Sequence, residues 1–263
     1  MGTLMTIQPA KARDAYDWLE PIADENLAAQ IEPFDSFWEG PEDVEKGYQQ
    51  FYEFYRSNYL KYLPTERSVR VLVISCGPGY FVNLLVEQGY RSVVGIDSFG
   101  SKVASAVRRN LDCREQRAFA FLAAHKQAFE VIICEQELNH LTKEEMLHFL
   151  RMVWESLTPD GTLIVHALNG ANPITGAEAL AQNFDHYNTL TEYSLRQVLE
   201  HARFERTQVF PLHLYVFYRN PANYVAWGIT AFLSLLFRAC FLLYGKSNRI
   251  FTKKIGACCR KPA

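Results

Sequence analysis

The sequence predicts an α/β fold built on a doubly wound, mainly parallel sheet, and three observations favour this fold. Apolar runs rich in β-branched residues, at 69–74, 129–134 and 162–167, alternate with segments of helical periodicity. The runs are nearly continuous in apolar character, as strands covered on both faces are. The chain has 263 residues, 49% of them apolar, and is therefore long enough to bury one such core together with appendages.

Residues 1–66 are predicted to form a helical extension that precedes the core. A first helix is expected at 11–20, and a second at 41–62 after a proline-marked break. Pro41 suits the first turn of the second helix, and acidic residues follow it there. This helix also carries aromatic residues at helical spacing, which is more typical of packing than of substrate contact. These residues are Tyr48, Phe51, Tyr52, Tyr55 and Tyr59.

The most informative stretch joins two predicted strands through a glycine-rich turn. The strand at 69–74 runs into Ser-Cys-Gly-Pro-Gly, a helical segment follows, and a second apolar run ends on Asp97. Strand, glycine turn, helix, strand and acid together indicate a nucleotide-binding βαβ unit, in which a carboxylate accepts both ribose hydroxyls. Asp97 follows Gly77 by about twenty residues, the usual offset of that acid.

The turn does not follow the dinucleotide pattern, however. A dinucleotide fingerprint has a third glycine three residues after the second, where helix and strand pack closely. In this chain that position, three after Gly79, is Val82. A nicotinamide-dependent oxidoreductase is therefore disfavoured.

The remaining elements of the core, residues 67–219, follow in alternation. Helix starts are well marked at Thr142, with Glu145 three residues on, and at Thr191. The other expected elements are a helix at 102–111, the end of a third strand at 118–122, helices at 142–157 and 192–202, a turn at 159–161, and late strands near 207–211 and 212–218.

The order of these motifs over residues 37–218 resembles that of class I S-adenosylmethionine-dependent methyltransferases. Three segments show this resemblance: the glycine turn with Asp97, the Phe-Glu-Val-Ile-Ile-Cys-Glu-Gln-Glu-Leu-Asn-His segment, and the Leu-Thr-Pro-Asp-Gly-Thr turn before the fifth strand. Segments at 37–42 and 184–196 are similar to bacterial methyltransferases that modify surface glycans of the O-antigen or capsule type. The resemblance implies a seven-stranded Rossmann-like sheet and S-adenosylmethionine as cofactor.

The resemblance also implies which residues form the site. His140 follows the fourth strand and His186 precedes the Thr191 helix, so both are candidate bases for a sugar hydroxyl; the alternative for each is a structural hydrogen bond. His166, at the end of the fifth strand, is a lesser candidate. The expected cofactor-binding residues are Ser75, Cys76, Gly77, Gly79, Asp97, Ser98, Ala118 and Glu135.

Several positions depart from the family pattern, most of them where the cofactor is held. These are Glu39, Val73, Ser75, Arg117 and Asn139. A lost carboxylate–ammonium hydrogen bond is worth about 1.5–3 kcal/mol, or one to two decades of affinity. Glu135, directly after the fourth strand, is the candidate to replace the missing acid.

Two functions therefore remain open. The first is O-methylation of a sugar hydroxyl in a membrane-linked or nucleotide-linked glycan. The second is a catalytically silent protein of the same fold, serving as scaffold or partner of a glycan-assembly enzyme.

The end of the chain differs in charge from the rest. Residues 206–263 carry nine basic and no acidic side chains, giving net +9 after a net −11. Within them lies an apolar run from Tyr224 to Tyr244, interrupted by Arg238. We expect residues 220–263 to form an apolar helix with a basic tail, of which 221–263 bind the cytosolic face of a membrane. The alternative is packing on the core or in a homodimer.

Composition narrows the remaining choices. A formal net charge of −2 argues against general nucleic-acid binding. The six cysteines show no Cys-x-x-Cys pair and no histidine at metal-ligand spacing, so no metal site is expected. Scattered thiols and an amino terminus without a signal-peptide pattern favour a cytoplasmic location.

Overall fold

The computed structural model describes residues 41–135, 137–181, 186–214 and 220–263. The helix expected at 11–20 and the departure at Glu39 lie outside this range. The elements in chain order are α2 (Pro41–Tyr59), η1 (Leu60–Tyr62), β1 (Arg70–Ile74), α3 (Tyr80–Glu87), β2 (Ser92–Asp97), α4 (Gly100–Arg108), β3 (Cys113–Glu115), α5 (Ala118–Ala124), β4 (Phe129–Cys134), α6 (Glu137–His140), α7 (Lys143–Ser156), β5 (Leu157–Leu168), α8 (Gly176–Ala181), α9 (Glu192–His201), β6 (Glu205–Leu212), α10 (Ala222–Leu243) and β7 (Lys254–Arg260).

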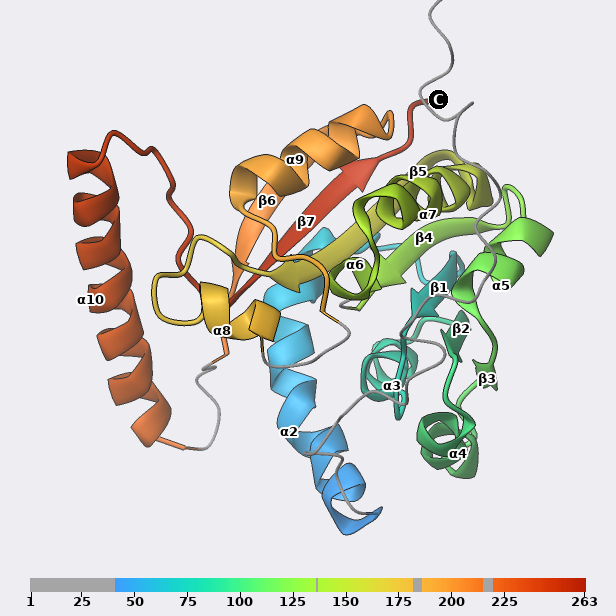
Figure 1. Cartoon of the computed structure of the whole chain (residues 1–263). Helices are drawn as coiled ribbons and strands as arrows, with labels where there is room; N and C mark the ends of the chain where they lie inside the picture. The colour runs from blue at the N-terminus through green and yellow to red at the C-terminus, as the bar shows by residue number, and fades with distance from the viewer. Residues whose placement is uncertain (1–40, 136, 182–185, 215–219) are drawn as a thin grey trace, which may run out of the picture.

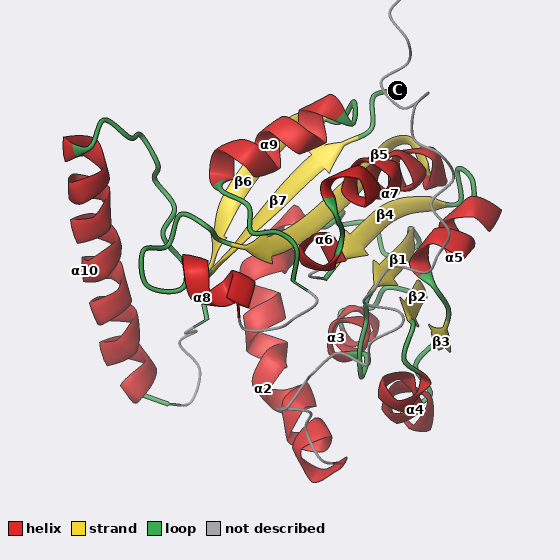
Figure 2. Cartoon of the chain, in the orientation of Figure 1, coloured by secondary structure: helices red, strands yellow, loops and turns green. Residues whose placement is uncertain are grey.

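One seven-stranded sheet organises these elements, in the order β3-β2-β1-β4-β5-β7-β6. The first five strands along the chain pair in parallel, and β7 runs antiparallel between β5 and β6. Helices lie on both sides of the sheet (Figures 1 and 2). The expected doubly wound, mainly parallel α/β fold is thus confirmed.

The alternation of side chains along each strand divides the core between the two faces of the sheet. Val71 and Val73 of β1 pack with α2, α3 and α4 on one face. Leu72 and Ile74 pack with α5, α7 and α9 on the other. Successive strand residues point to opposite faces of the sheet. A residue an even number of positions from a known one therefore shares its face.

The two helix starts marked in the sequence are present. Thr142 Oγ1 accepts a hydrogen bond from Glu145 N–H at 3.2 Å, while Glu145 Oε2 accepts one from Thr142 N–H at 2.7 Å. Thr191 forms the same reciprocal box with Ser194 at the start of α9. Each box satisfies two amide groups that the helix itself leaves without partners.

Three expected strands need correction. Residues 118–122 form part of helix α5, because Phe119 and Leu122, three positions apart, both face the core. In place of the late strands expected near 207–211 and 212–218, the described residues form one strand, β6, which continues through Pro211 and ends at Leu212; 215–218 lie outside the described residues. Proline is accommodated there because β6 is the edge of the sheet and needs no amide donor on its outer side.

The carboxyl-terminal segment also needs correction. Residues Lys254–Arg260 are not a basic tail but the inner strand β7, which pairs with both β5 and β6. Ile255, Ala257 and Cys259 alternate into the core on one face of the sheet. The boundary expected at 219/220 therefore does not separate a domain, since the sheet takes its sixth position from beyond it.

Helix α10 stands apart from this core. It lies at the edge of the molecule, outside the layers of the sheet (Figure 1). None of its 22 residues is buried. It is the one helix of the described residues that is long and apolar enough to cross a membrane.

Candidate functional site

The glycine turn after β1 has left-handed backbone at several positions. Ser75, Gly77 and Gly79 have φ angles of 58°, 53° and 82°. A Cβ on Gly79 would lie 2.9 Å from the Cβ of Ala106, so this glycine is required by close packing as well as by its backbone. The family pattern has a glycine at the position of Ser75, and the left-handed backbone explains why, because glycine adopts it without strain.

Asp97 ends β2 beside this turn. Its Oδ2 accepts a hydrogen bond from Gly77 N–H and its Oδ1 one from Phe99 N–H, each at 2.9 Å. The structure therefore brings together the two residues whose spacing indicated a nucleotide site. Each carboxylate oxygen keeps a further lone pair, which a ribose hydroxyl could use. Ser98, the next residue, is exposed.

Arg117 and Ala118, both singled out in the sequence, lie where the chain passes from β3 into α5. Arg117 is the exposed N-cap of α5, and Ala118 is the half-buried first residue of that helix. The Glu115 carboxylate packs against Gly100 at the start of α4. Arg117 occupies the capping position of α5 without a side-chain hydrogen bond to the helix end.

Three ionisable residues share one face of the sheet at the adjacent strands β4, β5 and β7. Cys134 pairs with Val165, so Glu135 and His166 come next to each other on the following position. His166 pairs with Gly256, and Lys254 lies two residues from that glycine on the same face. We call Glu135, His166 and Lys254 the strand-end cluster.

Helix α2 covers the strand-end cluster with two tyrosines. The Tyr55 hydroxyl donates to Glu135 Oε2 at 2.5 Å, and the Tyr59 hydroxyl lies 2.6 Å from His166 Nδ1 in a hydrogen bond. The Tyr55 ring stacks on Phe81 at 4.5 Å between centroids. The aromatic stripe of α2 therefore packs, as its spacing indicated, and also reaches the cluster with its hydroxyl groups.

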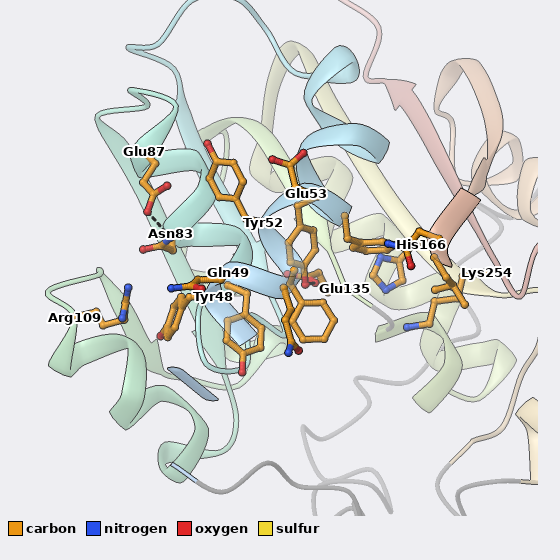
Figure 3. A pocket seen from close by; sticks show the side chains of 17 residues that line it. Tyr48, Gln49, Tyr52, Glu53, Asn83, Glu87, Arg109, Glu135, His166 and Lys254 are labelled. Atoms are coloured by element: carbon orange, nitrogen blue, oxygen red, sulfur yellow. Dashed lines mark hydrogen bonds between the residues drawn. The ribbon is translucent and has the colours of Figure 1, made fainter. Parts of the chain in front are cut away.

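A pocket of about 1000 Å³ opens over this cluster. Side chains of α2 and α3 line it together with Glu135, His166 and Lys254 of the cluster (Figure 3). Arg109 and Asn223, the latter in the first turn of α10, also line it. A pocket of this size accommodates a small organic molecule.

Burial changes the acid–base properties of the cluster. It raises the pKa of Glu135 to about 8, although the Tyr55 hydrogen bond and Lys254 act in the opposite direction. Burial lowers the pKa of Lys254 to about 8 and holds the pKa of His166 well below its usual value. Such shifts inside a pocket are typical of functional sites.

Two atoms of the cluster are buried without a hydrogen-bond partner. They are Glu135 Oε1 and His166 Nε2. Buried polar atoms are normally paired, because desolvation without a partner is costly. Both atoms belong to residues that line the pocket, so a bound molecule could supply the missing partners.

The two expected bases also lie together. The His140 and His186 rings are 4.9 Å apart between centroids and inclined at 65°. His186 Nδ1 lies 2.6 Å from the Ala179 carbonyl oxygen. Because a carbonyl only accepts, the proton is on Nδ1, and Nε2 of neutral His186 carries a lone pair. Neither histidine is among the residues that line the pocket of Figure 3.

Asn139, one of the departures, has a structural position. Its Nδ2 donates to the Asn188 carbonyl at 2.7 Å, and its Oδ1 accepts from Leu168 N–H at 3.2 Å. Fully buried, this side chain ties α6 to the end of β5 and to the segment that holds His186. Sequence reasoning assigned the position to the cofactor site and missed this link.

Sequence reasoning also missed Lys254 and Tyr55 as residues of the pocket, and Tyr59 as the hydrogen-bond partner of His166. The period of two along β5 and β7 would have placed Lys254 with His166, had β7 been recognised as a strand. Among the described residues, no group of three or more His, Cys, Asp or Glu side chains could hold a metal ion.

Known proteins resemble this arrangement at the level of family and fold. A family model described as a methyltransferase domain matches residues 47–209. No curated protein matches the chain at a significant level. The family match covers β1 to β5 and the first part of β6, and thus the glycine turn, Asp97 and Glu135.

Solved structures share the fold at low sequence identity. A methyltransferase dependent on S-adenosylmethionine, from Archaeoglobus fulgidus, is 15% identical with a TM-score of 0.62, over 84% of this chain and 97% of its own. A chain of the complex between the Haloferax volcanii Trm112 methyltransferase activator and a methyltransferase is 12% identical, with a TM-score of 0.65 over 89% and 100%.

A third structure, phosphoethanolamine N-methyltransferase 2 of Haemonchus contortus in complex with S-adenosylmethionine, is 12% identical with a TM-score of 0.51. The match covers 83% of this chain and 57% of that one. Family model, sheet order and glycine turn agree: the chain belongs to the methyltransferase domain family, as an S-adenosylmethionine-dependent methyltransferase of the class I fold.

Proposed function

We propose that this protein transfers the methyl group of S-adenosylmethionine to a sugar hydroxyl of a membrane-linked or nucleotide-linked glycan. The observation that carries the proposal is that the candidate residues gather at one edge of the sheet, where the parallel strands end. Asp97 at the glycine turn, Glu135 in the pocket and the His140–His186 pair all follow the carboxyl ends of strands or lie beside them. This is the edge at which α/β sheets bind ligands.

The residues present fit the cofactor. Glu135 Oε1 is buried without a partner, and an ammonium group is the partner that a carboxylate oxygen accepts most strongly. In our proposal Glu135 holds the ammonium group of the cofactor's amino acid part, Lys254 its carboxylate, and Asp97 its ribose. Once bound, the cofactor supplies an electrophilic methyl group on a sulfonium.

The acceptor hydroxyl needs a base, and the His140–His186 pair supports that role. The Ala179 carbonyl fixes the His186 proton on Nδ1, so Nε2 is the atom that takes the hydroxyl proton. His140 packs edge-on against this ring and restricts its orientation. The resemblance of residues 184–196 to glycan methyltransferases supports a sugar as acceptor; 184–185 lie outside the described residues.

The departures from the family pattern are compatible with an active enzyme. Val73 is fully buried in the core, and Glu135 offers a carboxylate at the end of the neighbouring strand β4. Ser75 keeps the left-handed turn without glycine. Asn139 stabilises the His186 segment.

Calorimetric titration of the full chain with S-adenosylmethionine tests the proposal. We expect saturable binding, and release of S-adenosylhomocysteine when a lipid-linked or nucleotide-linked glycan is added. Absence of heat at millimolar cofactor contradicts the proposal.

The second candidate function is a catalytically silent scaffold for a glycan-assembly enzyme, and the departures at Val73, Ser75, Arg117 and Asn139 favour it. Co-purification of a companion enzyme, together with no turnover by the isolated chain, would support that function. Turnover by the isolated chain excludes it.

A further inference from the structure

Helix α10 exposes apolar side chains on most of its circumference. Phe232 and Leu235 are 65% and 66% exposed, and Leu243 is 87% exposed. Trp227, at 42%, lies on another side of the helix. Water-exposed apolar area of this extent marks an interaction surface.

Both ends of α10 lie beside the methyltransferase core. Asn223, in its first turn, lines the pocket. Beyond its last turn the Ser247 carbonyl accepts from the Tyr193 hydroxyl at 2.9 Å, and Glu192 accepts from the amide of Ile250 at 2.9 Å. Leu212, where the chain leaves the sheet, pairs with Lys254, where it returns.

This topology excludes a helix that crosses a bilayer with its ends on opposite sides. The 22 residues span about 33 Å, enough for a hydrocarbon core of about 30 Å. A crossing would carry one end, with the core residues that hold it, to the far side. Since β6 before the helix and β7 after it pair in the same sheet, α10 must lie along a membrane rather than through it.

The polar groups of α10 are suited to lipid. The Thr230 and Ser234 hydroxyls donate to the carbonyls of Trp227 and Thr230 within the helix, at 2.9 and 2.8 Å. Their burial in hydrocarbon therefore leaves no donor unpaired. Arg238 continues the same stripe, and its long side chain can reach the headgroups.

Charge favours an anionic leaflet over a second copy of the chain. Arg238, Lys246, Arg249 and Lys253 lie in or next to α10, and no acidic residue occurs after Glu205. Two copies joined through this helix would bring like charges together. Anionic lipid would neutralise them.

We infer that α10 lies in the plane of an anionic membrane leaflet, with both of its ends and the entire methyltransferase core on one side of the bilayer. This inference rests on topology, exposure and charge, and is independent of the proposed reaction.

Flotation of the full chain with sealed vesicles tests the attachment. We expect the protein to float with vesicles that contain phosphatidylglycerol, and less with phosphatidylcholine alone. Leu235→Glu with Leu236→Glu should reduce flotation about tenfold, because two charges enter the apolar face. The matched control is Val86→Glu with Val107→Glu, exposed positions on α3 and α4, and it should float like the wild type.

Labelling from outside tests the orientation. In a Cys240→Ser background, Ala222→Cys and Lys246→Cys place a thiol near each end of α10. An impermeant maleimide should label both thiols on bound protein without detergent. The inference is overturned if the chain does not float, if the acidic pair on α10 floats as well as the control, or if one thiol reacts only after detergent. A dimer in sedimentation that the acidic pair dissociates assigns the helix to a second copy instead.

Discussion

Glu135 is the residue on which the cofactor proposal depends most. Its carboxylate has one oxygen held by Tyr55 and the other buried without a partner. We expect Glu135→Gln to weaken S-adenosylmethionine binding by ten- to a hundredfold, about 1.5–3 kcal/mol for a charged hydrogen bond. Calorimetry measures the change. Glu130→Gln, at the other end of β4 in a surface pair with Arg70, is the control and should bind normally.

The same residue predicts a pH dependence of stability. The pKa of Glu135 is about 8 in the folded protein and about 4.3 when unfolded. Between these values the folded state binds the additional proton, so stability conferred at low pH falls as pH rises toward 8. We expect Glu135→Gln to remove this fall and to melt above the wild type at pH 8 but not at pH 4. Thermal unfolding across this range measures it; parallel curves at all pH values contradict it.

His186 is predicted to act on the reaction and not on cofactor binding. His186→Gln should lower kcat by about 10²- to 10⁴-fold, the usual contribution of a general base, with unchanged affinity for S-adenosylmethionine. His201→Gln, on the exposed side of α9, serves as control. If His166→Gln lowers kcat and His186→Gln does not, the base lies in the strand-end cluster instead.

At this scale, short-range spacing was predictable and long-range burial was not. Gly77 and Asp97 could be expected to meet because one βαβ unit fixes both. The position of Lys254 in the pocket could not be predicted from the sequence. Its burial depends on the pairing of β7 with β5, and the basic residues of this segment are typical of a solvent-exposed tail. The hydrogen bond of Tyr55 to Glu135 joins residues 80 positions apart, which no local pattern encodes.

Among the elements, helix starts are the most predictable, because capping is local. Thr142→Ala removes the acceptor for Glu145 N–H and should lower the free energy of unfolding by about 1 kcal/mol. Urea denaturation measures this loss. Thr65→Ala, at an exposed position outside helices and strands, should leave the midpoint unchanged. An equal effect of both substitutions would show that the box contributes nothing specific.

Elements whose pattern is short were harder to predict. The five residues at 118–122 suit a strand by composition. They form a helix because Phe119 and Leu122 pack on the face of the sheet that α7 and α9 also cover. Strand β7 has apolar residues at every second position between basic ends, so its charge suggested a tail. In both cases tertiary contacts determined the structure.

For the whole molecule, the position of β7 makes the carboxyl terminus essential to the fold. Removal of residues 254–263 separates β6 from β5 and exposes both strands. We expect such a chain to lose its cooperative thermal transition. A chain that ends at Lys261, whose ammonium donates to the Leu157 carbonyl, should unfold like the wild type. A cooperative melt of the shorter chain would show that the sheet is stable without β7.

Because Asn223 of α10 lines the pocket, membrane attachment of the helix affects how the enzyme meets its methyl acceptor. If α10 lies in a leaflet, this side of the pocket is held at the lipid surface, and an acceptor carried by a lipid reaches it by lateral diffusion. Encounter then occurs in two dimensions. Turnover would follow the mole fraction of acceptor among the lipids, and dilution with inert lipid at constant bulk concentration would slow it.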